Sequence, residues 1–352
     1  MSGKVIRYFT RGNTARGLYS LLDSNIQGLK QVFLVDGGTP AEKAACLNRL
    51  AEQLLDKGIN IELLYCPADP DVVEGVIAAE KGAAVLLRQA APAVAGPNVH
   101  YVKIPGQAVI PADKQPEVIK LAEQAETARN NAYACFQKAL AVHDEWEDIY
   151  IKQLDKERAN ELTDELIARL IPLSGTGGKA VAKHRFLGAA TPKGAVDFIG
   201  NLTEDLAKRY FIKGRAGTGK STMLKKIAAA AETKGYDTEI YHCGFDPGSV
   251  DMVIIRELDF AIFDSTAPHE YFPEKATDSI IDLYKEIVTA GTDEKNSAEI
   301  REIAGRYRAL MSKATAYLAE SKRCKKQIEA CYPQASDPKT LTSVCNEIIS
   351  RL

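Results

Sequence analysis

The sequence of 352 residues repeats itself, and this internal duplication constrains the fold more than any other feature. Residues of the first half recur in the second half in the same order, 177 positions later. The matched pairs are Gly37 with Gly214, Lys43 with Lys220, Leu47 with Leu224, Gly58 with Gly235, Cys66 with Cys243, and Asp69-Pro70 with Asp246-Pro247. Ordered matches at one separation indicate two copies of one structural unit. We therefore expect two domains of the same fold.

The boundary between the copies is predicted near residues 171–179, which contain a proline and three glycines and are typical of a linker. This places the domains at 1–175 and 180–352. The linker superficially resembles a phosphate-binding loop. However, it follows a helical pattern rather than a strand, and Ala180 stands where such a loop has serine or threonine. It is therefore not predicted to be a site.

The second half alternates short apolar runs with helical segments. We expect strands over 209–213, 238–243 and 260–263, a helix over 220–234, and either a strand or a helix over 252–255. This alternation predicts an α/β fold, with a parallel sheet covered by helices on both faces. Residues 116–170 and 278–352 are rich in Lys, Glu, Ala and Leu, so each parallel-sheet domain is expected to end in a helical appendage.

A glycine-rich segment after the predicted strand 209–213 matches the pattern Gly-x4-Gly-Lys-Ser. The nucleotide-binding candidates are Gly214, Arg215, Ala216, Gly217, Thr218, Gly219, Lys220, Ser221 and Thr222. The glycines leave room for backbone N–H groups to approach a triphosphate, and the start of the following helix adds a partial positive charge. Lys220 is expected to reach the β- and γ-phosphates, and the Ser221 hydroxyl to bind Mg²⁺. The context of a strand before and a helix after supports this interpretation.

Asp264 ends the predicted strand 260–263, in the position of an acidic residue that holds Mg²⁺ beside such a loop. The next residue is Ser265 rather than a glutamate, so a catalytic base has to come from elsewhere. The candidates on loops at the same predicted sheet edge are Asp246, Asp251, His269 and Glu270. Lys220, Asp264, Asp246 and His269 are the predicted catalytic residues.

The first half lacks the same features. Glu42 stands at the position of Gly219, Ala44 at that of Ser221, and Arg88 at that of Asp264. A carboxylate beside a triphosphate is repulsive, and the two other changes remove magnesium ligands. We expect a degenerate copy with a structural or regulatory role, packed against the second half with pseudo-twofold symmetry.

With these residues, the second half resembles the P-loop NTPase superfamily over about residues 183–275. The whole chain resembles a family of internally duplicated P-loop ATPases of spore-forming Firmicutes, in which an Asp-Pro loop (Asp246-Pro247) and an Ala-Pro-His segment (267–269) follow the phosphate loop. The resemblance implies binding of ATP and Mg²⁺ through Gly214 to Thr222 and Asp264. It implies no further substrate.

Three functions are compatible with this pattern. The first is a Mg-ATP-binding protein with slow or regulated ATPase activity in the second half. The alternatives are a P-loop kinase that phosphorylates a small acceptor, and a non-enzymatic switch driven by nucleotide binding. The net charge of −2 gives no overall attraction to nucleic acid or anionic lipid. Neither a signal peptide nor a membrane segment is evident, so we expect a cytoplasmic protein.

Overall fold

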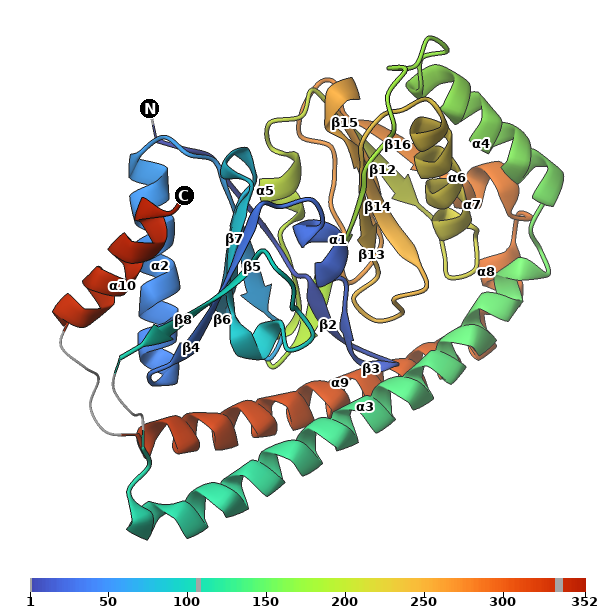
Figure 1. Cartoon of the computed structure of the whole chain (residues 1–352). Coiled ribbons are helices and arrows are strands. Elements are labelled where there is room, and N and C mark those ends of the chain that lie inside the picture. Colours follow the sequence, from blue (N-terminus) through green and yellow to red (C-terminus); the bar gives the residue numbers. More distant parts are fainter. Residues whose placement is uncertain (1, 106–108, 333–337) are drawn as a thin grey trace.

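The computed structural model describes residues 2–105, 109–332 and 338–352, and shows two sheets side by side above a long helical pair (Figure 1). Residues 1, 106–108 and 333–337, which belong to the predicted domains, lie outside the described residues. The first half contains β1 (Val5–Tyr8), β2 (Arg11–Thr14), β3 (Gly17–Ser20), α1 (Leu22–Ile26), β4 (Gln31–Gly37), α2 (Pro40–Asp56), β5 (Ile61–Cys66), β6 (Asp69–Ala78), β7 (Ala83–Leu87), β8 (Val99–Ile104), α3 (Gln115–Ile151) and α4 (Lys156–Leu170).

The second half follows the same order with two further short helices. It contains β9 (Ala182–Phe186), β10 (Gly188–Thr191), β11 (Gly194–Asp197), α5 (Ile199–Thr203), β12 (Lys208–Lys213), α6 (Lys220–Thr233), β13 (Thr238–His242), β14 (Val250–Ile255), β15 (Phe260–Asp264), β16 (Ser279–Asp282), α7 (Leu283–Ile287), α8 (Thr292–Lys295), α9 (Ser297–Ala330) and α10 (Pro338–Ser350). Strands therefore form where they were expected, and residues 252–255 belong to a strand.

The two six-stranded sheets have the same topology. Their orders are β1-β5-β6-β7-β4-β8 and β9-β13-β14-β15-β12-β16, which match position by position. The chain is thus an α/β protein, but the expectation of purely parallel sheets is wrong. β6 runs antiparallel to β5 and β7, and β14 runs antiparallel to β13 and β15. The connections explain the reversal, since only residues 243–249 and 256–259 flank β14, too few for the crossover that a parallel pair requires.

Two long helices run beside each other beneath both sheets. α3 has 37 residues and α9 has 34, and the two are antiparallel neighbours (Figure 1). The region predicted to be helical from residue 278 starts with strand β16, because Ser279–Asp282 adds to the edge of the sheet beside β12. Among the described residues, every helix is too short or too polar to cross a membrane.

The terminal helix of each half packs on the core of the other half. Leu166 and Leu170 of α4 join the core that contains Leu224 of α6. Conversely, Val344 and Ile348 of α10 join the core around α2 in the first half. The buried Cys345 thiol of α10 lies 3.5 Å from the Cys46 thiol of α2. Each half therefore completes the core of its neighbour, while the division into domains at 175–180 stays a prediction.

A buried arginine joins the halves at their interface. Arg185 of β9 is 0 % exposed, and its guanidinium binds Glu62 of β5 at 2.8 Å and Glu239 of β13 at 3.0 Å. It also donates to Asn25 of α1 and stacks 4.0 Å above the ring of Tyr8. Arg185 thus bridges two buried carboxylates, one from each half, while Glu239 also binds Arg256 at 2.7 Å and Glu62 lies 3.7 Å from Lys183. Removing one partner from this buried ion cluster is expected to lower the stability of the fold, because an unpaired buried charge is unfavourable.

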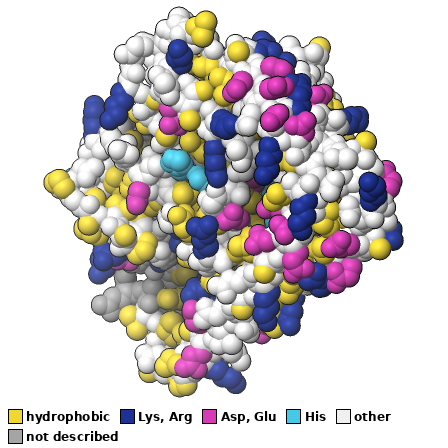
Figure 2. Space-filling model, turned by 90° about the vertical axis from the view of Figure 1, so that its right-hand side faces the viewer, with side chains coloured by type: hydrophobic (Ala, Val, Ile, Leu, Met, Phe, Trp, Pro, Cys, Tyr) yellow, Lys and Arg dark blue, Asp and Glu magenta, His cyan; other side chains and the backbone are white. Residues whose placement is uncertain are grey.

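Charges of both signs cover the face of the molecule at the right of Figure 1. Figure 2 shows Lys and Arg side chains interspersed with Asp and Glu over this face, with hydrophobic side chains scattered among them. Mixed signs over short distances largely cancel their field beyond about one Debye length, roughly 10 Å. The described residues of this face consequently form no extended patch of a single sign.

Candidate functional site

The predicted phosphate loop connects β12 to α6. Two of its residues, Gly217 (φ 72°) and Gly219 (φ 82°), adopt the left-handed conformation that glycine tolerates best. Gly219 is the N-cap of α6, and no side chain caps the helix there. The first N–H groups of α6 are therefore not satisfied by a capping side chain, which is the condition for anion binding at a helix start.

The remaining residues of the loop are held by local contacts. Thr218 is buried, and its hydroxyl donates to the carbonyl of Arg215 at 2.8 Å. The Arg215 guanidinium binds Asp293 of α8 at 2.8 Å and lies over the ring of Tyr284. Ala216 is half-buried, whereas Thr222 is exposed on the first turn of α6. The arginine is thus engaged by the protein itself.

Three predicted ligands of Mg-ATP come together beside this loop. The Lys220 ammonium donates to the Arg215 carbonyl at 2.8 Å and lies 3.5 Å from the Asp264 carboxylate. The Ser221 hydroxyl accepts a hydrogen bond from the backbone of Val250. Asp264 also accepts from Thr266. A cation, a hydroxyl and a carboxylate, which the sequence separates by up to 44 positions, thus share one end of the sheet.

Asp251 adds a second carboxylate to this group. Met252 pairs with Phe263 across β14 and β15, so continuing the register by one residue places Asp251 opposite Asp264. Side chains alternate along a strand, and Val253 faces the core against α6, which puts both carboxylates on the same side as Lys220. Burial first, and then the charge of Asp264, raise the pKa of Asp251 to about 7. In the sequence, the feature that marks Asp251 is its place as a single acidic residue just before the apolar run 252–255.

This pKa leads to a prediction about stability in the metal-free protein. Because the pKa of Asp251 is about 7 in the folded chain and ordinarily 3.8, the folded chain holds the extra proton between these values. Stability is therefore expected to fall as the pH rises from about 4 to about 7. Asp251→Asn should remove this contribution. Urea midpoints at about pH 5 and about pH 8, with a chelator present, measure it, and an equal pH dependence in both proteins would contradict the prediction.

The structure places His269 beside a partner that sequence reasoning missed. Its Nδ1 lies 2.7 Å from the carboxylate of Asp197, at the end of β11, and the Tyr271 hydroxyl donates to the same carboxylate at 2.6 Å. Burial raises the pKa of Asp197, but these two hydrogen bonds outweigh it and lower the pKa. His269 is thereby held in a fixed orientation. Its role as a base stays a prediction.

Asp246 is engaged within its own loop and by the other half. Its carboxylate accepts from the Gly248 backbone at 3.1 Å and from the Ser249 hydroxyl at 2.9 Å. It also lies 3.5 Å from the guanidinium of Arg16, in the turn between β2 and β3. The converse contact joins Lys193, in the turn between β10 and β11, to Asp71 at 2.6 Å. Each hairpin thus contacts the Asp-Pro loop of the opposite half.

A helix of the first half lies directly against the phosphate loop of the second. A Cβ on Gly217 would lie 2.6 Å from the carbonyl oxygen of Glu147 and 2.9 Å from its Cα. Only glycine fits this contact. Further along α3, the Tyr150 hydroxyl donates to Asp293, the residue that holds Arg215. The local sequence of the loop does not reveal this contact, because it comes from a helix about 70 residues earlier in a different half.

In the first half, a side chain occupies the loop. Glu42 is 3 % exposed, and its carboxylate accepts from the backbone N–H of Thr39 at 2.6 Å, which forms a capping box. The Glu42 carboxylate therefore occupies a backbone N–H group of the loop itself, in addition to the repulsion that the sequence predicts.

The sheet register also corrects the sequence match. Val35 pairs with Leu87 as Ile212 pairs with Asp264, so Leu87, not Arg88, occupies the position of Asp264.

Comparison with known proteins gives a limited result. No protein-family profile matches the chain, and no solved structure matches it. A phosphoribosylaminoimidazole-succinocarboxamide synthase of Cupriavidus metallidurans is 26 % identical over 137 residues, which is 37 % of this chain and 43 % of the synthase. The chain thus spans less than half the length of the curated relative that it matches, and the similarity is too partial to assign a family.

Proposed function

We propose that the second half binds Mg-ATP and hydrolyses it slowly, whereas the first half is a degenerate copy. The observation that carries this proposal is the convergence of an uncapped helix start, Lys220, Ser221 and Asp264 at one end of a sheet. The contacts of Lys220 with the Arg215 carbonyl and Asp264 are ones that phosphate oxygens and Mg²⁺ would replace. Catalysis would then rest on positioning and charge.

Ser265 follows Asp264, where a glutamate could have activated water, and Asp251 supplies a carboxylate for this role instead. In this proposal Asp264 and Ser221 hold Mg²⁺, and Asp251 orients the attacking water. His269, which Asp197 orients, acts on Asp251 through its charge and lowers the pKa of that carboxyl, against the larger effects of burial and Asp264. The match with a synthase contributes no substrate to this proposal, since it covers less than half of that protein.

The proposal predicts one Mg-ATP per chain. Calorimetric titration of the full chain should give a stoichiometry near one, and Asp264→Asn should remove the dependence of the affinity on magnesium. The matched control is Asp36→Asn, which changes a carboxylate at the corresponding edge of the first sheet, where Arg88 lies 3.7 Å away. Two equivalents of bound nucleotide, or equal effects of the two substitutions, would argue against a single site in the second half.

A nucleotide-dependent switch is the second candidate, and the contact between Glu147 and Gly217 favours it. A ligand that moves the phosphate loop would also move α3, and with it the antiparallel partner α9.

We further propose pseudo-twofold packing of the halves. Phe9 forms a bridge with Phe186, and the Asn13 amide donates to the Ala190 carbonyl. Both contacts join positions that are 177 apart, as expected around a twofold axis.

A further inference from the structure

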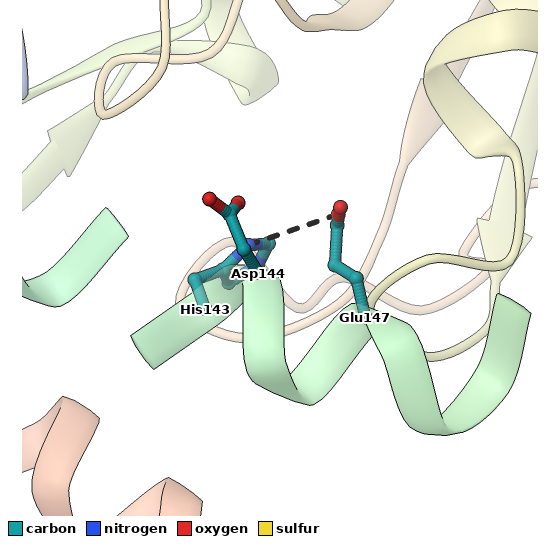
Figure 3. Close-up of side chains that lie close together, drawn as sticks. All are labelled: His143, Asp144 and Glu147. Atoms are coloured by element: carbon teal, nitrogen blue, oxygen red, sulfur yellow. Dashed lines mark ion pairs between the residues drawn. The ribbon is translucent and has the colours of Figure 1, made fainter. Parts of the chain in front are cut away.

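Three potential metal ligands from the first half lie on one turn of α3. A nitrogen of His143 and carboxylate oxygens of Asp144 and Glu147 all lie within 4.8 Å of one another. Figure 3 shows the side chains, with the His143 Nδ1 3.7 Å from a Glu147 oxygen. His143 and Glu147 are four residues apart, so they share a face of the helix. One imidazole and two carboxylates suit a divalent first-row transition ion such as Zn²⁺ or Mn²⁺.

The position of this cluster is the second observation. The backbone of Glu147 contacts the phosphate loop at Gly217. The His143 ring packs 6.2 Å from the ring of Phe245 and 5.8 Å from that of Tyr307, which fixes its side of the helix. The His143 ring and the Glu147 backbone are therefore held against the second half beside the proposed nucleotide site, whereas Asp144 is exposed on the same turn.

The charges around the three side chains also favour a bound cation. Neighbouring acids on α3 have basic partners, since Glu145 binds Arg306 at 2.6 Å and Asp148 binds Lys152 at 3.6 Å. Among the residues that the structure describes, no lysine or arginine forms an ion pair with Asp144 or Glu147. In the described part of the chain, the basic side chain paired with these carboxylates is His143, which lies beside Glu147 and is charged only when protonated. Two carboxylates next to a loop suited to a polyanion therefore raise the local negative potential. A bound cation would relieve it.

We propose that His143, Asp144 and Glu147 form a metal site that binds a divalent transition ion beside the phosphate loop. The ion would place positive charge from the first half next to the phosphates bound by the second. Metal and nucleotide should then each strengthen binding of the other by the same factor, as linkage requires. This coupling rests on the proposed function, whereas metal binding by itself does not.

The test uses the full chain, Co²⁺ as the probe, and visible absorption without nucleotide. All proteins carry Asp264→Asn, so that the predicted magnesium site does not contribute. The parent should show saturable d–d bands at one equivalent. His143→Gln should change the band positions and weaken binding by more than about tenfold, since even the loss of an outer-shell partner costs about 10–100-fold. Asp144→Asn should also weaken binding, whereas the matched control Asp148→Asn should not.

Two results would overturn the site. One is a parent protein without saturable Co²⁺ bands, and the other is a His143→Gln protein with unchanged bands and affinity, its fold verified by circular dichroism. A second comparison, between the wild-type chain and Lys220→Ala, both with Asp264 intact, separates this inference from the proposed function. The Lys220→Ala protein should keep the His143-dependent bands and lose their response to ATP. If the bands appear but ATP alters nothing in either protein, the metal site stands and the coupling fails, and the calorimetric titration with Mg-ATP then decides the nucleotide proposal by itself.

Discussion

Lys220→Ala is expected to reduce ATP turnover by at least about 100-fold, the scale on which a single preorganised charge stabilises a developing anion. The ammonium lies beside Asp264 and the phosphate loop, so its loss removes the main positive side chain from the proposed site. Phosphate release by the purified full chain, measured against time at saturating Mg-ATP, tests this. Turnover equal to that of the wild type would leave only the switch among the functions considered.

The duplication provides the control for this substitution. Lys43 is the counterpart of Lys220, but it lies 3.0 Å from the Gln89 amide oxygen, next to a loop already filled by Glu42. Lys43→Ala changes the same side chain at the same place in the fold. Its turnover should match that of the wild type. A similar loss in both variants would mean that both halves bind nucleotide.

Arg185→Met is expected to lower the free energy of unfolding by about 3–5 kcal/mol, as when one partner of a buried ion pair is removed. The substitution leaves Glu62 and Glu239 buried without their shared cation. Burial opposes ionisation of Glu239, yet Arg185, and then Arg256, lower the pKa of its carboxyl to about 2. Among the basic partners that the structure describes, in the variant Glu239 keeps only Arg256, at 2.7 Å, and Glu62 keeps only the more distant Lys183, at 3.7 Å. Urea denaturation followed by circular dichroism gives the difference.

Two further variants identify the cause. Adding Glu62→Gln and Glu239→Gln to Arg185→Met removes the two buried carboxylates that lost their shared cation and should recover much of the lost stability. Arg306→Met is the surface control, because Arg306 also binds two carboxylates, Glu145 and Glu302, but in solvent. It should shift the urea midpoint only slightly. No recovery in the triple variant would attribute the loss to packing instead.

Local sequence patterns were sufficient for the strand, loop and helix around Gly214 to Ser221. The apolar run before the loop, the glycines and the helical spacing after it are all contained in about 25 residues, and each signal has a direct backbone cause. The end of β15 at Asp264 was predictable for the same reason. These are the features that a single sequence can specify without knowledge of the neighbours.

The remaining features depend on which elements meet. The pairing of Asp251 with Asp264 follows from a strand register, and the antiparallel direction of β14 follows from the short connections on either side of it. The sequence match of Arg88 with Asp264 was off by one residue, since only the register with β4 fixes Leu87 there. Likewise, no local pattern could show that Glu147 lies against Gly217.

The exchange of α4 and α10 has a consequence for biosynthesis. Domains are usually completed in the order in which the ribosome produces them. Here the core around α2 (Pro40–Asp56) stays open until α10 (Pro338–Ser350) has been synthesised, long after α2 itself. A chain released before that point presents the buried face of α2, including Cys46 and Leu47, to chaperones and proteases. Chains that contain α10 and chains truncated before it therefore differ in the exposure of this face of α2.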